Sequence, residues 1–125
     1  MAIGTGTQIA LEPRATLDMP IAAALEATTA ALKTEGFGVL TSIDVQATLK
    51  EKLGESFDPC LILGACNPAL AHRALSTDGD MGLLLPCNVT LHETNGKTTV
   101  SIIDPVAMLA AAGGNPAIDE VAKEA

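Results

Sequence analysis

The sequence has very few aromatic residues, with two Phe and no Trp or Tyr among 125 residues. The core of the protein must therefore be aliphatic, and the aromatic platforms on which single-stranded nucleic acids stack are missing. Basic residues are also scarce, since seven Lys and Arg stand against fifteen Asp and Glu and give a net charge of -8. We therefore expect binding neither to nucleic acid nor to an anionic membrane surface.

Long apolar runs and a recognisable leader are missing too. The longest apolar stretch lies around residues 81–86 and is far shorter than the ~18 residues that span a bilayer. The first residues lack the basic and apolar regions of a signal peptide. The three cysteines are an odd number, which does not suit a disulfide framework. These features predict a cytoplasmic protein with free thiols in a reducing compartment.

Strand-like and helix-like segments alternate along the chain. Runs of β-branched and apolar residues predict strands, and apolar residues spaced three and four apart predict helices. Asn95-Gly96, between two strand-like runs, is a two-residue hairpin signal because both turn positions require positive φ. The expected strands are residues 7–17, 37–43, 61–65, 83–93 and 98–103, and the expected helices are 20–35, 45–53, 68–75 and 105–112.

The resulting order of elements is β-α-β-α-β-α-β-β-α. It predicts a two-layer α/β fold (an α+β arrangement) with a mixed sheet that contains the hairpin. We expect a single domain over residues 1–112, because a chain of this size has no room for a second one. Residues 113–125 then form a tail or a loose helix.

Local signals predict where the first two helices start and how the strand between them faces. Asp18, an acceptor shortly before Pro20, is expected to cap the first helix and so marks its start. Asp44 is expected to cap the second helix, and Gly54 to end it. Four residues of the intervening strand are expected to share one face of the sheet: Phe37, Val39, Thr41 and Ile43.

Two Cys-Asn steps, Cys66-Asn67 and Cys87-Asn88, are the feature most suggestive of chemistry. Cys66 ends the expected third strand directly before a helix start, so its thiol faces the positive end of that helix, a position typical of reactive cysteines. Packing explains Cys66 equally well. Cys87 shares the apolar face of its strand and is interpreted first as a core residue, although Pro86 implies an edge or a bulge there. If the two strands are neighbours, the thiols approach each other.

The amides of these steps also have structural explanations. Asn67 fits a helix N-cap, and Asn88 fits a partner of the backbone beside the irregular strand start. Gly64, inside the expected third strand, indicates a close approach of the backbone to another group or to a ligand. No pair of carboxylates stands at a defined spacing, so general acid-base catalysis has no support and we expect a protein that is not an enzyme.

A complete metal site within one chain is not expected. Zinc requires four ligands, but His72 lies six helical positions beyond Cys66, about 240° around the helix. His92 differs in strand parity from Cys87 and should point to the opposite face. Each histidine is interpreted as a surface residue and Cys60 as a packing residue. A site shared across a dimer stays open, and no motif indicates a cofactor.

Four blocks of the sequence, residues 36–41, 43–45, 62–68 and 84–89, stand in a specific order and spacing. Together they resemble the DUF302 family of small bacterial and archaeal proteins, over about residues 17–109. The resemblance implies a compact α/β fold with a mixed sheet, commonly packed as a homodimer, and it implies no agreed activity. Because the Cys-Asn steps belong to the family's motif, the resemblance places the ligand-binding site at Cys66, Asn67, Cys87 and Asn88.

One leading hypothesis and two alternatives follow. The first is a non-enzymatic homodimeric module that binds a small polar or thiol-reactive ligand near the two Cys-Asn steps. The second is a thiol-dependent redox, sulfur-transfer or soft-metal-handling protein that uses Cys66, with or without Cys87. In the third, both thiols are packing residues and the function lies in binding a protein partner.

Overall fold

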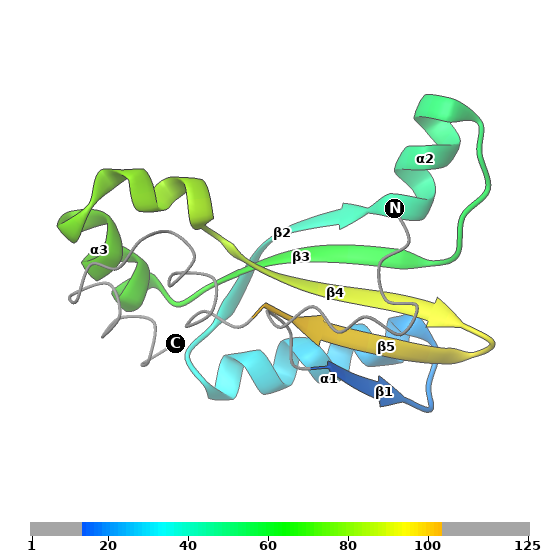
Figure 1. Ribbon diagram of the computed structural model, residues 1–125. Helices are drawn as coiled ribbons and strands as arrows, with labels where there is room; N and C mark the ends of the chain where they lie inside the picture. Colours follow the sequence, from blue (N-terminus) through cyan, green and yellow to red (C-terminus); the bar gives the residue numbers. More distant parts are fainter. Residues whose placement is uncertain (1–13, 104–125) are drawn as a thin grey trace.

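The computed structural model describes residues 14–103. Five strands form one sheet in the order β1-β5-β4-β3-β2, and every neighbouring pair is antiparallel (Figure 1). The expected two-layer α/β fold is confirmed, but the expected mixed sheet is wrong. The strands are β1 (Arg14–Leu17), β2 (Gly38–Asp44), β3 (Cys60–Cys66), β4 (Cys87–Thr94) and β5 (Lys97–Ile102), and the helices are α1 (Ile21–Thr34), α2 (Val45–Leu53), α3 (Pro68–Thr77) and the 3-10 helix η1 (Gly79–Leu84).

The antiparallel sheet follows from the places that the helices occupy. A parallel pair of strands needs a crossover that carries the chain back along the sheet. α2 lies at one end of the sheet and α3 with η1 at the other, so each connection leads directly into the next antiparallel strand (Figure 1). α1 does cross the sheet, but it joins β1 and β2, which are the two edge strands. Strand-helix alternation in the sequence does not distinguish these two kinds of connection.

α1 packs on one face of the sheet, which we call the covered face, and the core lies between them. The buried core residues are Ala24, Leu63, Ala65, Val89, Leu91 and Val100. We call the other side the open face. By strand pairing and alternation, its residues are Arg14, Thr16, Gly38, Thr41, Ile43, Cys60, Ile62, Gly64, Cys66, Asn88, Thr90, His92, Thr94, Lys97, Thr99 and Ser101.

The start of α1 is held by the sheet and not by its own flanking segment. No side chain caps the helix locally, so the expected cap at Asp18 is wrong. The Ile21 N–H instead donates to Oε1 of Glu93 in β4, at 2.7 Å. The buried Thr98 hydroxyl of β5 donates to the Met19 carbonyl at 2.9 Å. Two hydrogen bonds from the β4–β5 hairpin therefore fix where the helix enters.

The signals for α2 and for the hairpin are confirmed. Asp44 Oδ1 accepts a hydrogen bond from the Ala47 N–H at 2.9 Å, as an N-cap does. Gly54 ends the helix in the left-handed conformation at φ 69°. Asn95 and Gly96 have φ values of 55° and 77°, which a type I′ turn between β4 and β5 requires.

A register shift in β2 overturns the prediction that Phe37, Val39, Thr41 and Ile43 share one face. Val39 pairs with Ala65 and Thr41 with the preceding residue of β3, so one extra residue is inserted between them. Val39 therefore faces the core, whereas Thr41 and Ile43 lie on the open face. A period of two in the sequence cannot reveal a bulge of this kind.

The segment before β4 also differs from the prediction. A strand was expected to begin at Leu83, but residues 79–84 form η1 and β4 begins at Cys87. Leu83 is 86% exposed, so the apolar character of this run does not report a buried strand. Among the described residues, η1 is the one element that the expected order lacks. The expected helix over 105–112 and the expected tail over 113–125 lie outside the described residues.

Candidate functional site

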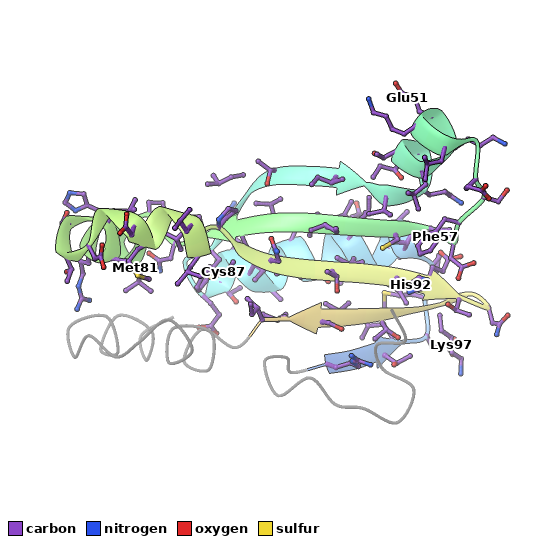
Figure 2. All side chains as sticks on the ribbon, turned by 45° about the horizontal axis from the view of Figure 1, so that its top comes forward. Glu51, Phe57, Met81, Cys87, His92 and Lys97 are labelled. Atoms are coloured by element: carbon purple, nitrogen blue, oxygen red, sulfur yellow. The ribbon has the colours of Figure 1, made fainter. Side chains whose placement is uncertain are left out.

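The two Cys-Asn steps lie at the same end of the sheet. Cys66 is the last residue of β3 and Cys87 is the first of β4, and these strands are neighbours. Cys87 pairs with Ala65, the residue directly before Cys66. Figure 2 shows Cys87 and Met81 together at this end, and Phe57, His92 and Lys97 at the opposite one. The structure therefore brings the two steps together.

Strand alternation places the two thiols on different faces. Cys66 has the parity of the open-face residue Gly64, and Cys87 has that of the core residue Val89. Both thiols are free and partly exposed. Burial raises the pKa of the Cys87 thiol, and the nearby Cys66 raises that pKa further. Cys87 is therefore a neutral thiol at neutral pH, and the two sulfurs lie close enough to influence each other.

Asn67 closes the N-terminus of α3. Its Oδ1 accepts hydrogen bonds from the N–H groups of Ala69 and Leu70, at 3.1 and 3.2 Å, and its carbonyl accepts from Ala71 at 2.9 Å. Pro68, the first helical residue, has no N–H to offer. The first turn of α3 therefore has its donors already paired, so none of these N–H groups is left to bind the Cys66 thiol.

Asn88 is the exposed polar group of this end. It pairs with Gly64 on the open face, and its carbonyl accepts a hydrogen bond from the Ile103 N–H at 3.2 Å. The Asn88 side chain is exposed. Its amide is thus available to a polar ligand, whereas the Asn67 oxygen is occupied by the helix.

The close approach expected at Gly64 is real, but protein atoms make it. A Cβ built on Gly64 would overlap with Thr41 Oγ1 of β2 and would lie 2.7 Å from Cγ of Pro86. The Thr41 hydroxyl and the Pro86 ring thus lie over the backbone of Gly64 on the open face. Gly64 is therefore explained by packing next to the Cys-Asn steps and does not itself indicate a ligand.

A second cluster, missed from the sequence, lies at the opposite end of the open face. Cys60 and His92 are directly paired across β3 and β4. His92 Nε2 lies 3.1 Å from Asp58 Oδ2, and its ring stacks on Phe57 with centroids 5.7 Å apart. Burial raises the pKa of Cys60, and Asp44 and Asp58 add to this. Cys60 is therefore a neutral thiol, and it lies beside the His92 imidazole, which Asp58 and Phe57 orient.

This second cluster depends on the register of β3 against β4, which the sequence does not reveal. Parity correctly placed His92 on the face opposite to Cys87, but no turn links β3 and β4 tightly enough to fix which residue faces His92. His72 is exposed on α3. Within residues 14–103, no group of three or more His, Cys, Asp or Glu side chains is arranged to hold a metal ion.

The comparison with protein families bears on this geometry. Residues 14–125 match DUF302, described as a domain of unknown function. The chain belongs to the DUF302 family. A crystal structure of an uncharacterized conserved DUF302 protein from Bacillus stearothermophilus is similar to it, with 31% sequence identity, a TM-score of 0.82, and coverage of 93% of this chain and 90% of that one. The similarity supports both the sheet and the family assignment.

No curated protein matches this DUF302 chain. None of the helices within residues 14–103 has the length and apolar character that crossing a membrane requires. The family therefore supplies the fold, and the proposal for function has to rest on the two Cys-Asn steps.

Proposed function

We propose that this DUF302 protein is a non-enzymatic homodimeric module that binds a small polar or thiol-reactive ligand at the Cys-Asn end of the sheet. The residues that would contact the ligand are Cys66, Asn67, Cys87 and Asn88. One observation carries the proposal: the partly exposed Cys66 thiol and the exposed Asn88 amide lie on the same face at neighbouring strand ends, with Cys87 beside them on the other face. A few polar groups on one surface of this kind are typical of small-ligand sites.

The state of the thiols favours binding over catalysis. A reactive cysteine usually has a lowered pKa, from a helix N-terminus or a nearby cation. Here the N–H groups at the start of α3 are taken by Asn67, and burial raises the pKa of Cys87. A neutral thiol such as that of Cys87 contributes polarizable contact surface and weak hydrogen bonds, which suit recognition of a small ligand better than nucleophilic attack.

The influence of Cys66 on Cys87 supports the second candidate, a thiol-dependent redox, sulfur-transfer or soft-metal-handling protein. Two thiols on neighbouring strand ends are ligands of the type that a soft cation prefers, since thiolates bind Cu(I) and similar ions. Metal analysis of the purified protein, with Cys66→Ser and Cys87→Ser as controls, tests this version. A stoichiometric soft metal that is lost in both variants would replace our proposal.

Alkylation rates separate the two candidates. With iodoacetamide at about pH 7, Cys66 should react no faster than a thiol of the urea-unfolded chain, and Cys87 more slowly by about tenfold or more. Because its pKa is raised, the rate of Cys87 should keep rising with pH beyond the point at which the rate of an ordinary thiol levels off. Mass spectrometry of the labelled peptides gives each rate. A Cys66 about tenfold faster than the unfolded chain would contradict the proposal.

Binding is tested with defined small probes by amide NMR. Acetamide, cysteamine and glutathione are titrated into the protein, and at least one should shift resonances at the Cys-Asn end. Asn88→Ala should abolish the shift, whereas Thr99→Ala, on the open face of β5, should leave it unchanged. Shifts that are absent for all three probes, or that persist in Asn88→Ala, would contradict a site at these residues.

The open face supports the homodimer. The chain carries fifteen acidic residues, yet none of the strand residues on this face within 14–103 is Asp or Glu. Two copies of an acidic chain repel each other unless the contact surface is free of like charge. Ile43 is 51% exposed on this face and offers apolar area to a second copy.

Substitution of Ile43 should dissociate the dimer. A buried lysine without a partner opposes association, so Ile43→Lys is expected to be monomeric in sedimentation velocity at concentrations where the parent chain is dimeric. Leu83→Lys is the matched control, because Leu83 is exposed in η1 and lies outside the open face. A monomeric parent chain, or a dimeric Ile43→Lys variant, would contradict this interface.

A further inference from the structure

An apolar groove lies between α1 and the β1–β5 side of the sheet, and none of the four residues of the Cys-Asn steps lines it. Its volume is about 420 Å³, which falls within the range of small-ligand sites. The lining comes from α1, β1 and β5, which lie side by side in Figure 1. The lining residues are Ala15, Leu17, Ala27, Thr28, Ala31, Leu32, Glu35, Val100 and Ile102.

Thr28 places a lone hydroxyl in this apolar lining. The residue is only 8% exposed. Among the hydrogen bonds of the described residues, none involves the Thr28 hydroxyl, although Thr34 and Thr77 bond back to their own helices. Buried hydroxyl groups normally have a partner, and leaving one unpaired is unfavourable. A ligand in the groove would supply the missing partner.

Glu35 sets the charge that the groove accepts. It is exposed just after the end of α1, seven residues from Thr28, and none of the lining residues within 14–103 is Lys or Arg. Two helical turns separate these residues, so they lie on the same side of the helix about 10 Å apart. A carboxylate near the mouth disfavours an anionic ligand and favours a neutral or cationic one.

We propose that the groove binds a neutral or cationic aliphatic ligand whose polar group pairs with the Thr28 hydroxyl. The volume corresponds to about a dozen non-hydrogen atoms, if each takes roughly the 30 Å³ share of a water molecule in the liquid. Medium-chain alcohols and amines have this size and charge. None of the four Cys-Asn residues lines this groove, so the proposal does not depend on the proposed function.

The test uses the full chain and the neutral fluorescent probe 1-naphthylamine, which is small enough for the groove. The probe should bind at one site per chain, and 1-nonanol and nonylamine should displace it at lower concentration than nonanoate. Glu35→Gln should improve the affinity for nonanoate several-fold. Thr28→Val, which keeps the shape of the side chain, should weaken 1-nonanol about tenfold without lowering the stability of the protein.

Filling the groove is the second arm of the test. Ala31→Phe should abolish probe binding, because Ala31 lines the groove, whereas Ala30→Phe, on the exposed surface of the same helix, should not. Thermal unfolding of both variants checks that they are folded. The proposal is overturned if the parent chain shows no saturable binding, as it would if another part of the chain or a second copy fills the groove. Undiminished binding by folded Ala31→Phe also overturns it.

Discussion

Replacing Gly64 with alanine is expected to lower the free energy of unfolding by about 1–3 kcal/mol. The added Cβ would overlap with Thr41 Oγ1 and would come within 2.7 Å of Pro86 Cγ. The Thr41 hydroxyl can rotate away, but the Pro86 ring is rigid, so the strands themselves must shift. Chemical denaturation followed by circular dichroism measures the change.

Gly38→Ala is the matched control for this substitution. Gly38 is also on the open face, in β2, and a Cβ added there meets no atom within 4 Å. Alanine at this position should be neutral or slightly stabilising, because it restricts the unfolded chain without a clash. Equal losses of stability in the two variants would show that general strand effects, and not the contact with Pro86, explain the requirement for glycine.

Replacing Leu91 with alanine is expected to destabilise the fold by about 2–5 kcal/mol. Leu91 lies in β4 and is fully buried at 0% exposure, beneath α1 in the centre of the core. With two Phe in the whole chain, aliphatic side chains have to fill the core volume, so the cavity left behind has few large neighbours that could relax into it. The loss would remove a large part of the 5–15 kcal/mol that typically stabilises a domain.

Leu53→Ala shows whether the effect comes from burial. Leu53 is 67% exposed near the end of α2, so its truncation should change the free energy of unfolding by about 0.5 kcal/mol or less. Both variants are compared with the parent chain by denaturant unfolding at the same pH. A loss in Leu53→Ala as large as in Leu91→Ala would mean that Leu53 is covered by another chain.

Local features of the fold could be predicted from the sequence because they depend on neighbouring residues. The Asp44 cap, the Gly54 stop and the Asn95-Gly96 turn each rest on the φ values or hydrogen bonds of a few consecutive residues. Such residues favour the same local structure in almost any tertiary context. The helix and strand types followed from them, together with the apolar spacing.

Features that depend on distant partners could not be predicted in this way. The start of α1 is held by a hydrogen bond to Glu93, which lies 72 positions away in the sequence, and no local sequence pattern indicates this partner. The bulge between Val39 and Thr41 depends on how β2 meets β3. The direction of each strand depends on whether a helix crosses the sheet or turns at its end, and the sequence pattern is the same in both cases.

The candidate site was predictable only in part for the same reason. Cys66 was expected at the end of its strand, and it lies there. Cys87 was expected inside a strand that begins at residue 83, and the approach of the two thiols was predicted only on the condition that their strands are neighbours. The cluster around Cys60 and His92 could not, because it requires the register of β3 against β4. The spacing of Thr28 puts it on one helix face with Leu25 and Leu32, and only the structure shows that its hydroxyl lies in a groove.

The hydrogen bonds at the start of α1 also bear on how the chain folds. The Ile21 N–H and the Met19 carbonyl find their partners on β4 and β5, across separations of 72 and 79 residues. The first turn of α1 can therefore be completed only after the hairpin has formed and docked against it. Helix and hairpin should open and close as one cooperative unit, even though most of the chain lies between them. The start of α1 would then gain these two hydrogen bonds only after the Asn95-Gly96 turn has closed the hairpin.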